Sequence, residues 1–111
     1  MIGIDILEVA RIKKKLEKNS NFIKSFLNEH EIEYLNKFKN STERICGFFC
    51  LKEAVIKAFE GKLGFKDIEI DHFENGKPFV KILKTGFESE KVEVSISHSK
   101  TVAVAVAILI K

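Results

Sequence analysis

The sequence has no tryptophan, and only two of its 111 residues are cysteines. Cys46 and Cys50 lie four residues apart, and no second pair of Cys or His residues falls at the spacing of zinc ligands, so we expect no structural zinc site. A disulfide between positions i and i+4 of one helix is geometrically awkward. We therefore expect both cysteines to be buried free thiols that pack as small hydrophobic groups.

A membrane-spanning segment and a signal peptide are also missing. The longest apolar run, residues 101–110, is far shorter than the roughly 20 residues that a spanning helix needs. Met1 opens directly onto a patterned segment rather than onto the regions of a signal peptide. We therefore expect a cytoplasmic protein with no membrane partner.

Repeats, low-complexity segments and linkers are absent as well, and the length suffices for one domain with a core but not for two. The apolar share of 45% and the charged share of 32% are typical of a globular protein. Ten phenylalanines against one tyrosine predict a core rich in Phe. The net charge of +3 permits an acidic partner without requiring one. We predict a single domain over residues 1–111.

The longest helical pattern runs from Glu43 to Gly61, and only three charged residues, Lys52, Glu53 and Lys57, interrupt its apolar middle. A helix that is apolar nearly all round is usually buried, where charges are unfavourable unless they are paired or functional. At about 100° per residue, Glu53 and Lys57 lie one turn apart on one face. They form either a partly exposed ion pair or a site for a metal ion and a phosphate. We favour the site, because a carboxylate and an amine suit these two ligands.

The N-terminal segment, Met1 to Leu7, alternates like a β-strand and carries Asp5 in its middle. This carboxylate either caps the following helix or has a functional role. Residues 8–18 are predicted to form an amphipathic helix, and its outer face carries Arg11, Lys13, Lys14, Lys15 and Lys18. Such a face is usually only solvated, and the alternative is a docking surface for an acidic partner.

Two shorter helical segments are expected before the central helix. Residues 21–27 should form one or two turns, and Asn28 with Glu31 fits the capped start of a helix that reaches about Phe38. Ser41 or Thr42 then caps the central helix.

The second half of the chain is predicted to form an antiparallel sheet. Residues 67–73 and 79–83 flank an Asn-Gly turn signal and should form a hairpin, and residues 92–98 and 101–110 should form two further strands. One face of the last strand carries valines and the other alanines, so we expect a central strand with a helix or another subunit against its alanine face. The fold class is α+β, with the N-terminal strand and the helices packed on a mostly antiparallel sheet.

Several short motifs follow one another along the chain. They are Gly3-Ile4-Asp5-Ile6 with Arg11-Ile12, a degenerate region from Phe22 to Glu31, Gly47, Lys52-Glu53-Ala54 with Lys57-Ala58, Asn75-Gly76-Lys77-Pro78, and Ser95-Ile96-Ser97-His98-Ser99. Each motif is weak alone, but their order and separations together are specific. Over essentially its whole length, the sequence resembles the holo-[acyl-carrier-protein] synthases, which are short bacterial 4′-phosphopantetheinyl transferases.

The resemblance implies a reaction that moves phosphopantetheine from coenzyme A to a serine of apo-acyl carrier protein and releases adenosine 3′,5′-bisphosphate. It implies that Asp5 and Glu53 bind Mg²⁺, or alternatively Mn²⁺, which neutralises charge on the pyrophosphate. Glu53 and Lys57 are the implied catalytic residues, and Lys57 stabilises or protonates the leaving bisphosphate. Either a metal-bound water or Glu53 acts as the base.

The resemblance also implies the contacts to coenzyme A, which fall on Lys52, Lys57, Lys62, Ser97, His98 and Ser99. The family usually has an arginine directly after Gly47, where it helps to hold a phosphate of coenzyme A, and this chain has Phe48 instead. We expect Lys62 to compensate for the lost arginine.

The implied partners are acyl carrier protein and further copies of the chain. Arg11 matches a family position that pairs with acidic residues of the carrier protein. We therefore predict that the basic helix docks the carrier through Arg11, Lys14, Lys15 and Lys18. The resemblance implies a homotrimer with active sites between subunits.

A basic α+β module that binds RNA or another acidic polymer without catalysis is the alternative prediction. The phenylalanines fall at core periodicities rather than on an exposed sheet face between arginines, as a base-stacking platform requires. This alternative also leaves Asp5 and Glu53 unexplained, so we expect no nucleic-acid partner. Transferases for polyketide or peptide carriers are usually much longer chains, which disfavours that third reading.

Overall fold

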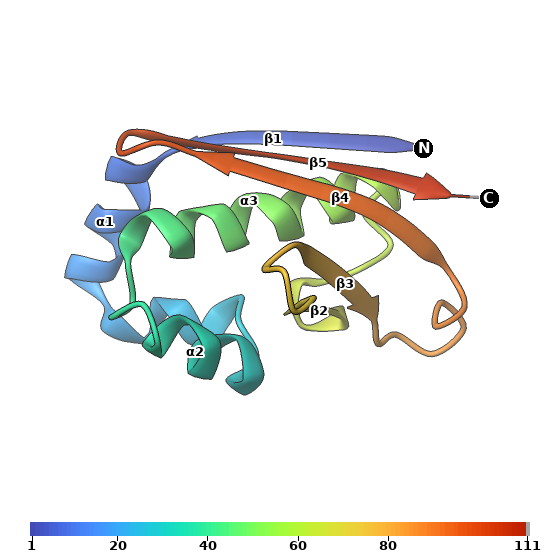
Figure 1. Cartoon of the computed structure of the whole chain (residues 1–111), viewed down its shortest axis with the longest axis horizontal. Coiled ribbons are helices and arrows are strands. Elements are labelled where there is room, and N and C mark those ends of the chain that lie inside the picture. Colours follow the sequence, from blue (N-terminus) through green and yellow to red (C-terminus); the bar gives the residue numbers. More distant parts are fainter. Residues whose placement is uncertain (111) are drawn as a thin grey trace.

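A long helix, α3 (Thr42–Ala58), runs along one face of a three-stranded antiparallel sheet in the computed structural model, which describes residues 1–110 (Figure 1). The elements in chain order are β1 (Ile2–Glu8), α1 (Val9–Lys18), a 3-10 helix (Ser20–Ser25), α2 (Glu29–Asn36), α3, a second 3-10 helix (Phe65–Asp67), β2 (Ile68–His72), β3 (Pro78–Ile82), β4 (Lys91–His98) and β5 (Val102–Ile110). Every predicted element is present with ends shifted by at most three residues, which confirms the α+β fold class. Within residues 1–110, no helix combines the length and the apolar character needed to cross a bilayer.

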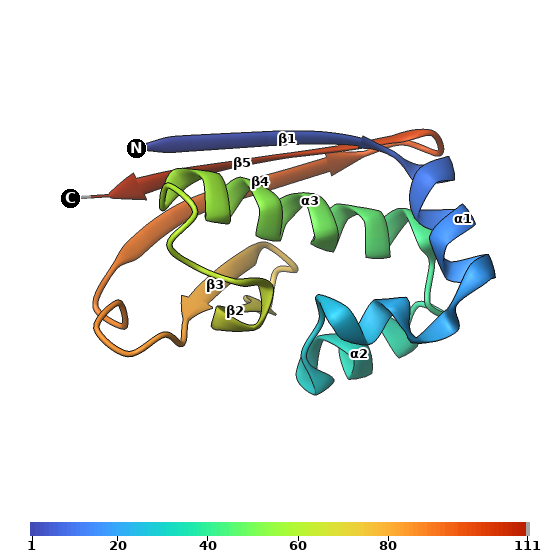
Figure 2. The ribbon, with the colours of Figure 1, turned by 180° about the vertical axis from the view of Figure 1, so that it is seen from behind.

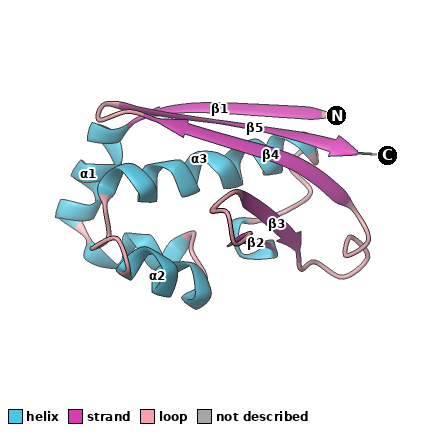
Figure 3. Cartoon of the chain, viewed as in Figure 1, coloured by secondary structure: helices cyan, strands magenta, loops and turns pink. Residues whose placement is uncertain are grey.

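The three-stranded sheet has the order β1-β5-β4, so β5 is its central strand, as predicted. The hairpin of β2 and β3 is also present, but it forms a separate two-stranded sheet (Figure 3). The prediction of one sheet in the second half of the chain is therefore wrong. The loop at 83–90 lets β4 leave the hairpin and pair with β5 instead.

Small residues allow α3 to lie directly against the sheet, and Figure 2 shows this contact from behind. The alanines of β5 that face α3, Ala103, Ala105 and Ala107, are at most 2% exposed. A Cβ atom on Gly3 would lie only 1.9 Å from the carbonyl oxygen of Ala54, so no larger residue fits there without separating β1 from α3. The partner of the alanine face is thus a helix of the same chain rather than another subunit.

The opposite face of the sheet is apolar and uncovered. Ile2, Ile4 and Ile6 of β1 are between 61% and 68% exposed, and Ile108 of β5 is 46% exposed. Val104 and Val106 lie between them on the same face. We call Ile2, Ile4, Ile6, Val104, Val106 and Ile108 the open sheet face. Contiguous exposed apolar side chains of this kind mark a surface that meets another molecule.

Phenylalanines fill the core on the other side of α3, as the composition predicts. The ring of Phe26 lies 5.2 Å from that of Phe22 and 5.0 Å from that of Phe49, between centroids, and Phe65 adjoins Phe49 at 5.4 Å. The two cysteines of α3 are buried free thiols, which confirms that prediction too.

Candidate active site

Asp5 points from the middle of β1 toward α3, where it meets Lys57. The Nζ atom of Lys57 donates a hydrogen bond to Asp5 Oδ1 at 3.2 Å and another to the Ile4 carbonyl oxygen at 3.0 Å. The N-cap of α1 is Glu8, three residues further along, so Asp5 does not cap that helix. The alternative of a capping role is therefore wrong, and the carboxylate remains available for another purpose.

Glu53 lies on α3 one turn before Lys57 and next to Asp5. Burial raises the pKa of Glu53, and the negative charge of Asp5 raises it further, while Lys57 acts in the opposite direction. Within residues 1–110, Glu53 forms no ion pair within 4.0 Å. Two carboxylates thus share one region with too little positive charge, which is the condition that a bound cation relieves.

The donor set of Asp5 and Glu53 fits a hard divalent cation. Mg²⁺ usually takes one or two protein carboxylates and fills its other positions with water and substrate phosphates. In the part of the chain that the structure describes, no group of three or more His, Cys, Asp or Glu side chains could form a metal cage from protein alone. An open site of this kind suits a metal that also binds the substrate.

A second group of predicted site residues lies between α3 and β4. Gly47 of α3 faces β4, because a Cβ atom there would lie 3.3 Å from Ile96 Cγ2 and 3.9 Å from His98 Cδ2. A pocket opens at this point, lined by Tyr34, Arg44, Gly47, Phe48, His72, Gly76, Pro78, Ile96 and His98. We call it the α3–β4 pocket. It brings together three motifs that are far apart in the sequence.

The two regions do not merge within one chain. Asp5 belongs to β1 and His98 to β4, and β5 runs between these two strands. Lys57 lies in the last turn of α3, whereas Gly47 lies in its first half. A single chain therefore presents two separate parts of a site, one at each edge of the sheet.

The serines beside His98 point elsewhere. Ser97 faces the open side of the sheet next to Ile4 and Val104, because side chains alternate along β4. Ser99 lies in the turn after β4, where its Oγ accepts hydrogen bonds from the backbone N–H groups of Thr101 and Val102, both at 3.2 Å. Of the three predicted phosphate contacts in this segment, His98 alone lines the α3–β4 pocket.

The predicted contact between Lys52 and coenzyme A does not agree with the position of this side chain. Its side chain is completely buried, and its Nζ atom donates to Glu31 Oε1 at 2.7 Å and to the Phe65 carbonyl oxygen at 3.1 Å. This burial conflicts with the predicted contact to coenzyme A, because no part of the ammonium group is open to a ligand. Glu31 is equally buried and also accepts from the backbone N–H groups of Asn28 at 2.7 Å and Ile70 at 2.6 Å. The pair is a structural link between α2, α3 and β2.

Lys62 does not compensate for the missing arginine in the way that the sequence suggested. It is exposed and follows the C-terminal end of α3, while Phe48 lies in the second turn of that helix. Lys62 is also not among the residues that line the α3–β4 pocket. Any phosphate contact that it makes lies outside this pocket.

The basic face of α1 is free in the described part of the chain. Val9 and Ile12 are buried against the core, and the outer face is exposed at Arg11, Lys14, Lys15 and Lys18. Within residues 1–110, none of these four side chains forms an ion pair. Their charge is therefore not neutralised within the chain.

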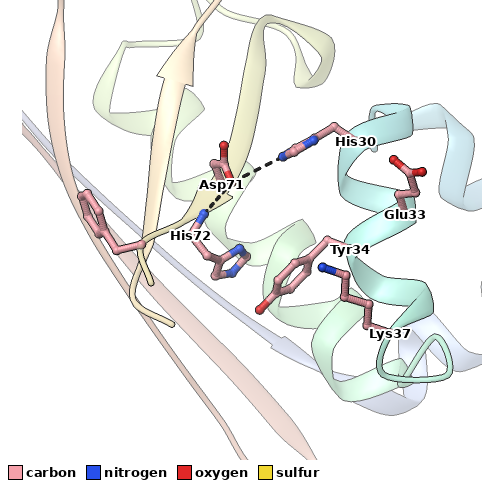
Figure 4. A pocket seen from close by; sticks show the side chains of 7 residues that line it. His30, Glu33, Tyr34, Lys37, Asp71 and His72 are labelled. Carbon is pink, nitrogen blue, oxygen red and sulfur yellow. Dashed lines mark hydrogen bonds and ion pairs between the residues drawn. The ribbon is translucent and has the colours of Figure 1, made fainter. Parts of the chain in front are cut away.

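An aromatic stack beside the α3–β4 pocket was not predicted. The rings of Tyr34 and His72 lie 3.9 Å apart between centroids at an angle of 8°, and Phe48 stacks on Tyr34 at 6.0 Å. Figure 4 shows the Tyr34 and His72 rings face to face beside a neighbouring hollow, where Asp71 pairs with His30. These residues come from α2, α3 and β2, and no local spacing in the sequence indicates that they meet.

Comparisons with known proteins identify the family and the fold of the chain. The family model of the 4′-phosphopantetheinyl transferase superfamily matches residues 1–107. A holo-[acyl-carrier-protein] synthase of Clostridium botulinum is 45% identical over 97% of this chain and 94% of its own length. A crystal structure of Helicobacter pylori holo-[acyl-carrier-protein] synthase in complex with coenzyme A has a TM-score of 0.90 and 34% identity, and the match covers 99% of this chain and 100% of that one. The Bacillus anthracis synthase in complex with CoA (3′,5′-ADP) has a TM-score of 0.83 and 40% identity, covering 97% and 93% of the two chains.

Proposed function

The chain belongs to the 4′-phosphopantetheinyl transferase superfamily and is a phosphopantetheinyl transferase, and from this premise we propose that it modifies acyl carrier protein. In the proposed reaction, coenzyme A donates 4′-phosphopantetheine to a serine of the apo-carrier, and adenosine 3′,5′-bisphosphate leaves. The observation that carries the proposal is the meeting of Asp5, Glu53 and Lys57 between β1 and α3. The family match over residues 1–107 supports a single transferase domain over residues 1–111.

The three side chains divide the chemistry between them. Asp5 and Glu53 would hold Mg²⁺ or Mn²⁺, which would supply positive charge at the pyrophosphate. Lys57 is half exposed, so its ammonium group can turn from Asp5 to a phosphate oxygen and stabilise or protonate the leaving bisphosphate. The serine oxygen forms a new bond to the pantetheine phosphorus as the bridging oxygen departs. Glu53, a carboxylate without an ion-pair partner in residues 1–110, is the candidate acceptor for the serine proton.

The reaction is tested directly by the intact mass of an apo-acyl carrier protein after incubation with this protein, coenzyme A and Mg²⁺. The expected result is a gain of one phosphopantetheine that disappears when EDTA removes the metal. A folded protein that modifies none of several carriers would show that the proposed function is wrong.

We also propose that the chain assembles as a homotrimer. The count of three subunits is what the family resemblance implies. Two features of the structure support an assembly of several copies. The open sheet face presents Ile4 and Ile6 to solvent although they are apolar. In addition, Asp5 and His98 lie at opposite edges of the sheet, and an assembly in which the β1 edge of one copy meets the β4 edge of another brings both parts of a site together. The face that supports assembly is thus not the alanine face, which α3 covers.

Replacing Ile4 by glutamate is expected to convert the trimer to monomers, because a charge buried in an apolar interface is strongly unfavourable. Light scattering coupled to size-exclusion chromatography should show a threefold lower mass, with loss of transfer activity. Leu83→Ser is the matched control, since Leu83 is 48% exposed and lies outside the open sheet face. A wild-type protein that is already monomeric and active would contradict the proposal.

Reversing two charges on α1, as in Arg11→Glu with Lys14→Glu, is expected to weaken carrier docking. The KM for the carrier should rise roughly 10-fold with little change in kcat, because these rim charges act on association rather than on the chemical step. The effect should shrink as salt concentration increases. Lys91→Glu is the control, because Lys91 is exposed at the far end of the sheet from α1. An equal rise in KM for the control variant would attribute the effect to net charge alone.

A further inference from the structure

Phe48 brings an aromatic ring and no charge to the α3–β4 pocket. The side chain is only 5% exposed, and its ring stacks on Tyr34 at 17° and on His72 at 25°. It contributes a flat apolar surface instead of a charge. If an anionic group enters the pocket, another residue must bind it.

Arg44 lies four residues before Phe48, on the same face of α3, and it lines the same pocket. Its guanidinium carbon lies 3.7 Å from the centroid of the Phe38 ring. A guanidinium that stacks on an aromatic face keeps its N–H donors free at the edges for a planar or tetrahedral anion. The stacking therefore orients Arg44 without occupying its hydrogen-bonding groups.

The charge of Arg44 is not neutralised in the described part of the chain. Within residues 1–110, no carboxylate lies within 4.0 Å of its guanidinium, and the neighbouring Glu43 lies instead 3.8 Å from His98 Nδ1. Among the residues that line the pocket, Arg44 is the one permanent cation. Burial lowers the pKa of His72, so that imidazole does not add a charge at neutral pH.

The rest of the pocket suits the nucleotide end of coenzyme A. Pro78, Ile96 and Phe48 offer flat or apolar surfaces to a base, and the glycines at 47 and 76 let a ligand approach the backbone. Coenzyme A carries two anionic groups, a pyrophosphate and a 3′-phosphate. In the proposed assembly, the pyrophosphate belongs with the metal ligands and Lys57 at the β1 edge of one copy, which leaves the 3′-phosphate for the β4 edge of its neighbour.

We propose that Arg44 binds the 3′-phosphate of coenzyme A and sets the preference of this transferase for coenzyme A over donors that lack this phosphate. Phe38 is the positioning residue that orients the guanidinium. The proposal deepens the proposed function and rests on it.

The test compares two donors, coenzyme A and 3′-dephospho-coenzyme A, in the wild type and in Arg44→Gln and Arg44→Ala. Glutamine retains a flat group over Phe38, so this variant keeps the packing while it removes the charge. The kcat/KM with coenzyme A is expected to fall roughly 10- to 100-fold, as for loss of a charge-assisted hydrogen bond. The value with 3′-dephospho-coenzyme A should stay within about twofold of wild type, since the lost contact is absent from that donor.

Lys37→Ala is the matched control. Its Nζ atom lies 5.9 Å from the centroid of the Tyr34 ring, so it adjoins the same aromatic stack, but it lines the neighbouring hollow rather than the α3–β4 pocket (Figure 4). This variant should keep the wild-type preference between the two donors. A selective loss with coenzyme A in Lys37→Ala, and not in the Arg44 variants, would overturn the proposal.

Binding measurements separate this proposal from the proposed function. Calorimetry with adenosine 3′,5′-bisphosphate and with adenosine 5′-monophosphate needs no transfer to occur. Wild type should bind the bisphosphate more tightly, and Arg44→Gln should remove most of that difference. Equal losses for both nucleotides, or for both donors, would mean that Arg44 only packs on Phe38 and would overturn the proposal. Absence of transfer by a wild type that retains the Arg44-dependent difference would instead contradict the proposed function alone.

Discussion

Replacing Glu53 by glutamine is expected to reduce phosphopantetheine transfer at least about 100-fold, because it removes a carboxylate from the proposed metal site and a candidate base in one step. Asp5→Asn should have an effect of the same order, since both carboxylates are proposed ligands of the same ion. The two losses should not multiply in the double variant, because residues that act as a unit are not additive. Steady-state transfer rates at saturating Mg²⁺ measure both effects.

The stability of the same variant distinguishes loss of function from loss of fold. The pKa of Glu53 is raised in the folded protein, so the folded state binds a proton more tightly than the unfolded state does. The free energy of unfolding of the metal-free protein therefore falls as pH rises from the ordinary value of 4.5 through the raised pKa. Glutamine removes this penalty, and metal-free Glu53→Gln should be at least as stable as wild type at neutral pH.

The change in Tm on addition of Mg²⁺ tests whether Glu53 binds the metal. Mg²⁺ should raise the Tm of the wild type by mass action, and this shift should be absent in Glu53→Gln. Glu90→Gln is the control, because Glu90 is exposed in the loop before β4 and should keep both the shift and the activity. A Glu53→Gln protein that transfers at the wild-type rate, or that retains the Mg²⁺ shift, would remove Glu53 from the metal site.

The elements of this fold could be predicted because their signals are local. The two faces of β5 differ in side-chain size, so the strand had to be central with a close neighbour on its alanine side. The hairpin itself was predicted, but its separation from the three-stranded sheet could not be, because strand pairing depends on contacts between distant parts of the chain. The choice between a helix and a subunit for the alanine face was open for the same reason, and Gly3 against Ala54 decides it only in three dimensions.

The residues of the candidate site also fall into two groups, those with a local signal in the sequence and those without one. Asp5, Glu53 and Lys57 could be identified because a charge inside an apolar strand or helix is unusual wherever it occurs. Lys52 was misassigned because the family resemblance alone implied its contact with coenzyme A. Its pairing with Glu31, which lies 21 residues earlier, has no local signal in the sequence. Arg44 was missed because nothing in its local spacing marks it, and its environment comes from α2, the hairpin and β4.

The buried pair of Lys52 and Glu31 leads to the largest expected effect on stability. Lys52→Met should lower the free energy of unfolding by about 3–5 kcal/mol, because it leaves the Glu31 carboxylate buried without a counter-charge. Lys57→Met is the matched control on the same helix. Lys57 is also paired with a carboxylate, but its side chain is half exposed, so its loss should change stability by less than about 1 kcal/mol. Urea denaturation of the metal-free proteins measures both values.

A second substitution should identify the cause of the instability of Lys52→Met. Adding Glu31→Gln should recover part of the loss, because glutamine carries no charge and its carbonyl still accepts from Ile70 N–H. A Lys52→Met protein that is as stable as Lys57→Met but has a raised KM for coenzyme A would restore Lys52 as a ligand contact, because a lysine that binds phosphate affects affinity rather than the packing of α2, α3 and β2.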